Sequence, residues 1–122
     1  TSQRGVEKGL MSGESLDGIH RSMQQKLSAE GASFDGIYAY TGSDCGHLPK
    51  PDPEMILTAS ESFFIDRRQS WMIGDADRDI KMGKAAGLRG TIRVRSDKPI
   101  GVEADSTVES VMDISNLFEK LL

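Results

Sequence analysis

The 122-residue sequence is poor in cysteine, in long apolar runs and in net charge. Cys45 is its single cysteine, which excludes a disulfide within the chain and favours a reducing compartment. No apolar run approaches the roughly 18 residues that a membrane-spanning helix needs, and no signal peptide opens the chain. The net charge is only −4 and basic residues are scattered singly, which argues against nucleic acid as the main partner. These absences predict one globular domain in the cytoplasm, with neither a membrane nor a nucleic acid as partner.

Helix-like and strand-like segments alternate along the chain. A helix-start signal at Ser12 precedes apolar residues at helical spacing, and Gly31 is suited to end that helix. The further predicted segments are a strand at Phe34–Tyr40, a loop at Thr41–Pro53, a helix at Glu54–Phe64, a strand ending at Gly74, a helix from Asp79 to Gly87, a strand at Thr91–Arg95, a polar loop and a helix at Ile114–Leu121. This alternation predicts an α/β fold, a three-layer Rossmann-like parallel sheet with helices on both faces and right-handed crossovers.

The most informative segment carries three carboxylates at alternate positions, Asp75, Asp77 and Asp79, directly after the apolar residues that end at Gly74. Charge of one sign at this density needs a cation. Asp77 and Asp79 have a simpler interpretation as dipole partners of a helix N-terminus, each worth about 0.3–1 kcal/mol. Asp75 precedes the helix and follows a strand, where open α/β sheets bind ligands, so we interpret it as a metal or phosphate site.

Two further segments have the residue types that bind anions. Thr1-Ser2-Gln3 could hold an anion with its hydroxyl and backbone N–H groups, although a plain polar turn is the commoner interpretation of such a triplet. Lys50 precedes Pro51-Asp52-Pro53, and the two prolines fix where its side chain emerges before a helix. A lysine held in this way can reach a phosphate, whereas a lone lysine before a helix is usually solvated.

A zinc site is the third possibility that the sequence raises, because Cys45-Gly46-His47 has the form of half a zinc-binding motif. Zinc needs three or four ligands. The chain has one cysteine and two histidines in total, and the second histidine, His20, falls within a predicted helix. We therefore do not expect a structural zinc.

In linear order these segments resemble the haloacid dehalogenase superfamily of phosphatases, and within it the branch that acts on heptose bisphosphate and histidinol phosphate. The resemblance covers about the first hundred residues. It is carried by Thr1-Ser2-Gln3-Arg4-Gly5-Val6, Lys8-Gly9, Phe34-Asp35-Gly36-Ile37-Tyr38, Lys50-Pro51-Asp52-Pro53, Met72-Ile73-Gly74-Asp75-Ala76-Asp77-Arg78-Asp79-Ile80, Gly83 and Ala85-Ala86-Gly87.

The resemblance implies a role for each matching residue. Thr1, with its neighbours Ser2 and Gln3, would bind the phosphoryl group of the substrate. Lys50 would balance the charge on nucleophile and phosphate, and Asp75 would bind Mg²⁺. Asp79 would support the site from close by.

Two departures from the family pattern are informative. No Asp-x-Asp segment precedes Thr1, and Asp75-Ala76-Asp77 lies after the lysine motif, in the position of the fourth motif. We therefore expect the nucleophile, its partner acid and the first strand to lie upstream, so that residues 1–122 are an incomplete core without activity of their own. The cysteine-rich zinc loop of the branch is also reduced to Cys45 and His47, which weakens the inference of a substrate within the branch.

The predicted function is a Mg²⁺-dependent phosphatase that hydrolyses a small phosphorylated metabolite through an aspartyl-phosphate, with heptose 1,7-bisphosphate or histidinol phosphate as the implied substrate. One alternative is a non-catalytic module that kept the fold. Another is a receiver-like signalling domain, but a receiver places its threonine and lysine after the phosphoacceptor aspartate, whereas Thr1 and Lys50 precede Asp75.

Overall fold

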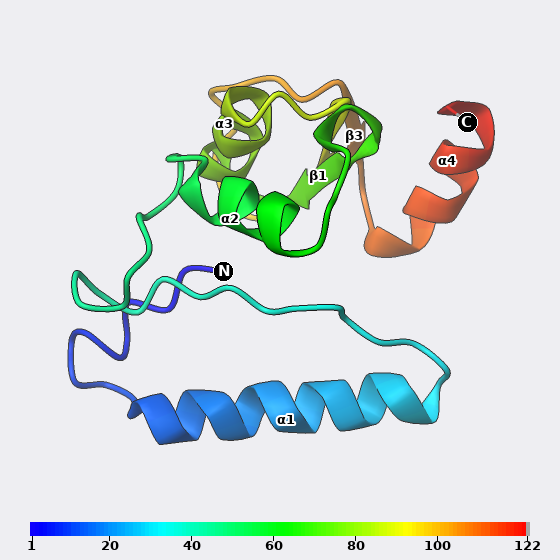
Figure 1. Cartoon of the computed structure of the whole chain (residues 1–122). Helices are drawn as coiled ribbons and strands as arrows, with labels where there is room; N and C mark the ends of the chain where they lie inside the picture. Colours follow the sequence, from blue (N-terminus) through cyan, green and yellow to red (C-terminus); the bar gives the residue numbers. More distant parts are fainter. Residues whose placement is uncertain (122) are drawn as a thin grey trace. The chain divides into compact units, whose positions relative to one another are not determined.

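The computed structural model describes residues 1–121, which fall into two compact units, one of residues 1–49 and one that begins at Lys50. Figure 1 labels the helices and strands in chain order. The elements are α1 (Gly13–Ala29), α2 (Glu54–Ser62), the 3-10 helix η1 (Arg67–Gln69), β1 (Trp71–Gly74), α3 (Asp77–Ala85), β2 (Gly90–Val94), β3 (Ser106–Val108), the 3-10 helix η2 (Val111–Asp113) and α4 (Ile114–Leu121). None of the helices described is long and apolar enough to cross a membrane.

The first unit is built on α1, which agrees with the helix predicted there. The Ser12 hydroxyl accepts a hydrogen bond from the Ser15 amide at 3.0 Å and so caps the helix. Gly31, at φ +77°, turns the chain out of it, in a conformation that costs glycine little.

The predicted strand at Phe34–Tyr40 is wrong for most of its length. Only Tyr40 forms a β-bridge, parallel to Ser2, and the Gln3 amide donates to the Tyr40 carbonyl at 2.7 Å. A strand needs a neighbour that pairs along its backbone. Among the described residues the sole neighbour is the short segment beside Tyr40, so residues 34–39 stay irregular despite their strand-forming composition.

The second unit contains a parallel three-stranded sheet with the order β1-β2-β3. In its register Met72 pairs with Thr91 and Gly74 pairs with Arg93. β3 lies within the segment that the sequence predicts to be a polar loop. Ser106–Val108 is only three residues long and two of them carry hydroxyl groups, so the strand has no alternation of apolar and polar side chains.

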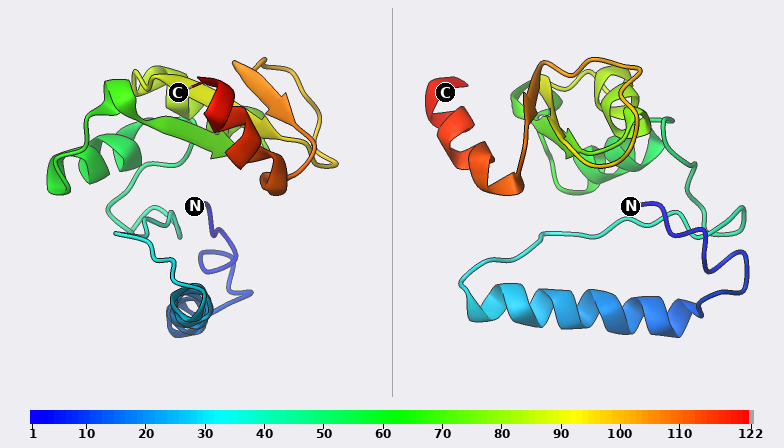
Figure 2. Two further views of the ribbon diagram at one scale, coloured as in Figure 1. Left: turned by 90° about the vertical axis from the view of Figure 1, so that its right-hand side faces the viewer. Right: turned by 180° about the vertical axis from the view of Figure 1, so that it is seen from behind.

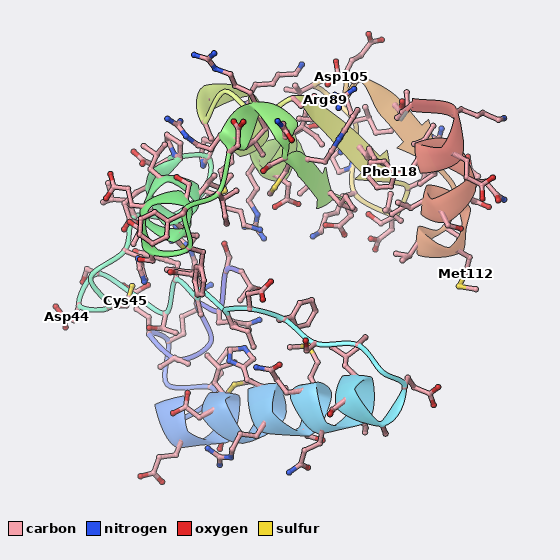
Figure 3. The ribbon with its side chains drawn as sticks, turned by 45° about the vertical axis from the view of Figure 1, so that its right-hand side comes forward. Asp44, Cys45, Arg89, Asp105, Met112 and Phe118 are labelled. Carbon is pink, nitrogen blue, oxygen red and sulfur yellow. The ribbon has the colours of Figure 1, made fainter. Side chains whose placement is uncertain are left out.

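Helices cover both faces of the sheet, as predicted. A Cβ on Gly83 of α3 would lie 2.6 Å from the Met72 Cβ and 3.0 Å from the Thr91 Cγ2, so α3 packs on the face that bears these side chains. Successive strand residues point to opposite faces. The Trp71 ring accordingly faces α4, where the Phe118 ring meets it edge-on at 5.4 Å (Figure 3). The left view of Figure 2 shows α4 in front of the strands.

Three helix boundaries differ from prediction. Helix α2 ends at Ser62 rather than at Phe64, because Phe64 adopts φ +53°, outside the helical region. Helix α3 begins at Asp77 rather than Asp79, so Asp77 and Asp79 both lie in its first turn. It ends at Ala85 rather than at Gly87, because Gly87 adopts φ +70°.

Replacing Gly83 by alanine should destabilise the second unit. The added methyl meets the Cβ of Met72 on β1, which cannot move without shifting the strand, so we expect a loss of about 1–3 kcal/mol in unfolding free energy. Thermal or urea unfolding would measure it.

Gly18→Ala is the matched control, because Gly18 lies within α1 and an added methyl meets nothing closer than the end of the Arg21 side chain at 3.8 Å. It should raise stability by about 0.5–1 kcal/mol. A stabilising effect of Gly83→Ala would contradict the packing of α3 on β1.

Candidate functional site

The three alternate carboxylates lie where β1 ends and α3 begins, and each meets a basic side chain from a different segment. Lys98 Nζ lies 3.2 Å from the Asp75 Oδ1. The two other pairs are closer, with Arg93 Nη2 at 2.5 Å from the Asp77 Oδ1 and Lys50 Nζ at 2.5 Å from the Asp79 Oδ1. The need for cations at this segment is thus met by the protein's own side chains.

Asp75 and Lys98 form the exposed pair, with side chains 41% and 44% exposed. Partial burial pushes the pKa of Asp75 upward, but the hydrogen bond and charge of Lys98 outweigh it and hold that pKa below its usual value. The carboxylate is therefore ionised at neutral pH and open to solvent. Asp75 is the most exposed of the three carboxylates, so a solvent cation reaches it most easily.

Asp77 and Arg93 form a half-buried pair within the second unit. The Arg93 side chain is 1% exposed and the Asp77 side chain is 31% exposed. Burial acts to raise the pKa of Asp77, but hydrogen bonds from Arg93 and from the backbone amides of Val102 and Gly101 lower it overall.

Asp79 and Lys50 form the most buried of the three pairs, with side chains 6% and 15% exposed. The other carboxylate oxygen of Asp79 accepts a hydrogen bond from the Ala76 amide at 3.1 Å, which caps α3 from its third residue. A Cβ on Gly74 would meet the Asp79 carboxyl carbon at 2.6 Å, so glycine is needed for the carboxylate to approach the strand end. Lys50 is thereby anchored at the tip of β1 and is not a solvated lysine.

The start of α2 fixes the backbone near Lys50. The Asp52 carboxylate accepts a hydrogen bond from the Glu54 amide at 2.9 Å. This bond satisfies one of the free amides of the first helical turn. Lys50 therefore emerges from a capped helix start, as the flanking prolines predicted.

A magnesium ion fits the chemistry of Asp75. Mg²⁺ retains several waters and is commonly held by one or two carboxylates together with substrate phosphate oxygens. One ionised, solvent-accessible carboxylate at a strand tip satisfies that pattern. Residues 1–121 contain no group of three His, Cys, Asp or Glu side chains placed to hold a metal by themselves. Water, phosphate or further protein groups would have to complete the coordination.

Thr1, Ser2 and Gln3 belong to the first unit, whereas Lys50, Asp75 and Asp79 belong to the second. Within the first unit, the Gln3 side-chain amide donates to the Thr1 hydroxyl at 3.3 Å. That the Thr1 segment meets Lys50 at one phosphate stays a prediction.

Cys45 and His47 lie in the loop of the first unit, where Figure 3 labels Cys45 beside Asp44. The Cys45 thiol donates to the His47 carbonyl at 3.7 Å, and the His47 ring meets the Tyr38 ring edge-on at 5.6 Å. Both side chains thus make contacts with other groups of the first unit.

Sequence reasoning missed Arg93 and Lys98. Arg93 offered a signal, since an arginine between Ile92 and Val94 of a buried strand must find a partner. Its partner could not be named without the register that sets Arg93 beside Gly74. Lys98 gave no signal, because it lies in a polar loop 23 residues after Asp75.

Comparison with known proteins identifies the family. The sequence model of the HAD-hydrolase-like family, that is haloacid dehalogenase-like hydrolases, matches residues 47–111. The chain belongs to this family. The receiver-like alternative is therefore wrong, and the resemblance drawn from the motifs is confirmed.

The two relatives compared below share one name. The D-glycero-β-D-manno-heptose-1,7-bisphosphate 7-phosphatase of Pasteurella multocida is 31% identical over 99% of this chain and 72% of that protein. The protein of the same name from Vibrio cholerae is 32% identical over 93% of the chain and 66% of its own length. The chain thus spans about two thirds of the length of these relatives.

Solved structures support the fold of the HAD-like hydrolase. The D,D-heptose 1,7-bisphosphate phosphatase of B. bronchiseptica, complexed with magnesium and phosphate, superposes with a TM-score of 0.81 over the whole chain and 73% of that protein, at 23% identity. A HAD-superfamily hydrolase of Geobacter sulfurreducens gives 0.55 over 79% of the chain and 46% of its own length, at 26% identity.

A double-mutant cycle tests the pair of Lys50 and Asp79. Lys50→Met and Asp79→Asn should each destabilise the protein, and their effects should fall short of additivity by about 0.5–3 kcal/mol because the side chains are in contact and largely buried. Urea unfolding of the two single variants and the double variant measures this coupling.

The matched control is the exposed pair Arg95 and Glu109, at 2.8 Å with side chains 50% and 75% exposed. The coupling free energy between Arg95 and Glu109 should be about 0–1 kcal/mol, as for other surface ion pairs, and lower than that between Lys50 and Asp79. Equal coupling in both cycles would show that Lys50 is not held at Asp79 as described.

Proposed function

We propose that this HAD-like hydrolase is part of a Mg²⁺-dependent phosphatase that hydrolyses a sugar phosphate, with heptose 1,7-bisphosphate as the favoured substrate. The observation that carries the proposal is the buried contact of Lys50 with Asp79 beside the open carboxylate of Asp75 at the end of β1. Open α/β sheets bind ligands at this position. The names of the relatives support the substrate class.

Each residue of this site has a role that follows from its charge and its contacts. Asp75 offers an ionised carboxylate to Mg²⁺, and the bound ion would reduce the repulsion between an anionic nucleophile and the phosphoryl group. Lys50 brings a second positive charge to the phosphoryl oxygens. Asp79 holds Lys50 in place and keeps its ammonium from swinging into solvent. Such preorganised charge is the main source of catalysis for phosphoryl transfer.

The Thr1-Ser2-Gln3 segment would donate hydrogen bonds to the same phosphoryl group. Its hydroxyl and backbone N–H donors are suited to an anion. This role rests on the motif order of the family.

The nucleophile, in this proposal, is an aspartate on a strand that precedes Thr1. That strand would pair with β1, which among the described residues pairs only with β2. A carboxylate nucleophile gives an aspartyl-phosphate, which water then hydrolyses with the help of an acid/base aspartate. A cytoplasmic location, predicted from the single cysteine, fits a phosphorylated metabolite as substrate.

Asp75→Asn in the full-length protein should abolish Mg²⁺-dependent phosphate release while leaving thermal unfolding nearly unchanged, because the side chain is exposed. Mg²⁺ binding, measured by calorimetry, should be lost in parallel. Phosphate release from heptose 1,7-bisphosphate is the assay, and histidinol phosphate is the comparison substrate, for which kcat/KM should be at least about tenfold lower, equivalent to 1.4 kcal/mol.

Asp17→Asn, on the exposed face of α1, is the matched carboxylate control and should keep full activity. Near-normal turnover in Asp75→Asn would refute the metal assignment. A preference for histidinol phosphate would overturn the substrate assignment while leaving the phosphatase assignment intact.

A further inference from the structure

Arg93 compensates the charge of Asp77, although its burial makes an arginine costly at this position. It lies on β2 between Ile92 and Val94, and its side chain is 1% exposed. Its Nε atom has no hydrogen-bond partner within the described part of the chain. An unpaired buried donor loses its hydrogen bond to water without replacement, a penalty that an apolar side chain would avoid. The stability of the strand therefore does not explain why an arginine occupies this position.

The guanidinium group of Arg93 joins three parts of the second unit. Nη1 donates to the backbone carbonyl of Asp75 at 3.2 Å. Nη2 donates to the Asp77 carboxylate at 2.5 Å and to the Val102 carbonyl at 2.7 Å. One side chain thus links the residue after β1, the first turn of α3 and the segment that follows β2.

Asp77 strengthens the link to that last segment. Its two carboxylate oxygens accept the Gly101 amide at 3.0 and 3.1 Å, and one of them accepts the Val102 amide at 3.1 Å. A Cβ on Gly101 would lie 2.9 Å from the Asp77 Oδ2, so the approach requires glycine. We call Arg93, Asp77, Gly101 and Val102 the clasp.

The clasp contacts the segments that carry both partners of the exposed ion pair. Arg93 binds the backbone carbonyl of Asp75, and Asp77 binds the Gly101 amide, three residues after Lys98. Without the clasp, the residues between β2 and β3 would keep more of the backbone conformational freedom that folding removes. The 3.2 Å contact of Lys98 with Asp75 therefore depends on a buried anchor several residues away.

We propose that Arg93 is a positioning residue of the phosphatase site. Together with Asp77, it holds Asp75 where its carboxylate binds Mg²⁺, and holds Lys98 where its ammonium contacts a phosphate oxygen once Asp75 has taken up the metal ion. This inference rests on the proposed function, and Arg93 itself touches neither metal nor substrate.

The test compares Arg93→Met, Asp77→Leu and the double variant of the full-length protein. Each single variant should lower the unfolding temperature, because it leaves one charge without its partner. The double variant should recover much of that loss, since both charges are gone. Its dissociation constant for Mg²⁺, measured by calorimetry, should nevertheless stay about 10–100-fold higher than in the wild type. The inhibition constant of inorganic phosphate should rise by a similar factor. A conservative Arg93→Lys variant should have a Mg²⁺ dissociation constant between those of the wild type and Arg93→Met.

Two further measurements separate positioning from mere stabilisation. Hydrogen exchange at the Gly101 and Val102 amides should accelerate in Asp77→Leu, because the carboxylate that accepts them is lost. Asp105→Asn is the stability control, since the Asp105 carboxylate accepts the Thr91 amide at 2.8 Å near the opposite end of β2. It should lower the unfolding temperature and leave the Mg²⁺ dissociation constant unchanged.

A double variant that recovers its stability and binds Mg²⁺ and phosphate like the wild type would overturn the proposal, as would unchanged amide exchange in Asp77→Leu. If the wild type binds Mg²⁺ but hydrolyses no phosphate ester, the proposed function fails, while the binding constants of the variants still decide the positioning role. A wild type that binds no Mg²⁺ refutes both.

Discussion

The crowding of negative charge at the end of β1 is the constraint on which the second unit depends. Three carboxylates within five residues cannot be brought to the edge of a sheet unless cations compensate them. The fold supplies these cations from three separate segments, Lys50 before α2, Arg93 on β2 and Lys98 beyond it. The turn between β1 and α3 therefore forms ion pairs with three segments that are distant from it in the sequence.

The three ion pairs differ in burial, and therefore in the free energy that breaking each pair costs. A buried pair is costly to break, because removing one partner leaves an uncompensated charge. Asp79 with Lys50 is of this kind, and so is Arg93, although its partner Asp77 is half-buried. The pair of Asp75 and Lys98 is open to solvent on both sides, where an ion pair is worth about 0–1 kcal/mol and exchanges easily. Of the three pairs, this one gives up its contact to a metal ion and a phosphate at the lowest cost.

Local signals in the sequence predicted the elements that depend on local interactions. Asp75 at a strand tip and Lys50 before α2 could be identified because turn residues, prolines and apolar runs surround them. Arg93 was missed because its importance comes from a strand register, in which it pairs with Gly74. The strand predicted at Phe34–Tyr40 failed for a related reason, since a strand needs a partner that composition does not reveal. Ser106–Val108 was too short and polar to give a pattern.

We propose that the tip of β1 binds a metal ion through Asp75 and a phosphoryl group through Lys50. The decisive measurement is a crystal structure of the full-length protein with Mg²⁺ and orthovanadate. We expect an Asp75 oxygen at about 2.0–2.1 Å from the Mg²⁺, with Lys50 in contact with both Asp79 and a vanadate oxygen. Metal and vanadate bound elsewhere, with Asp75 still paired to Lys98, would contradict it.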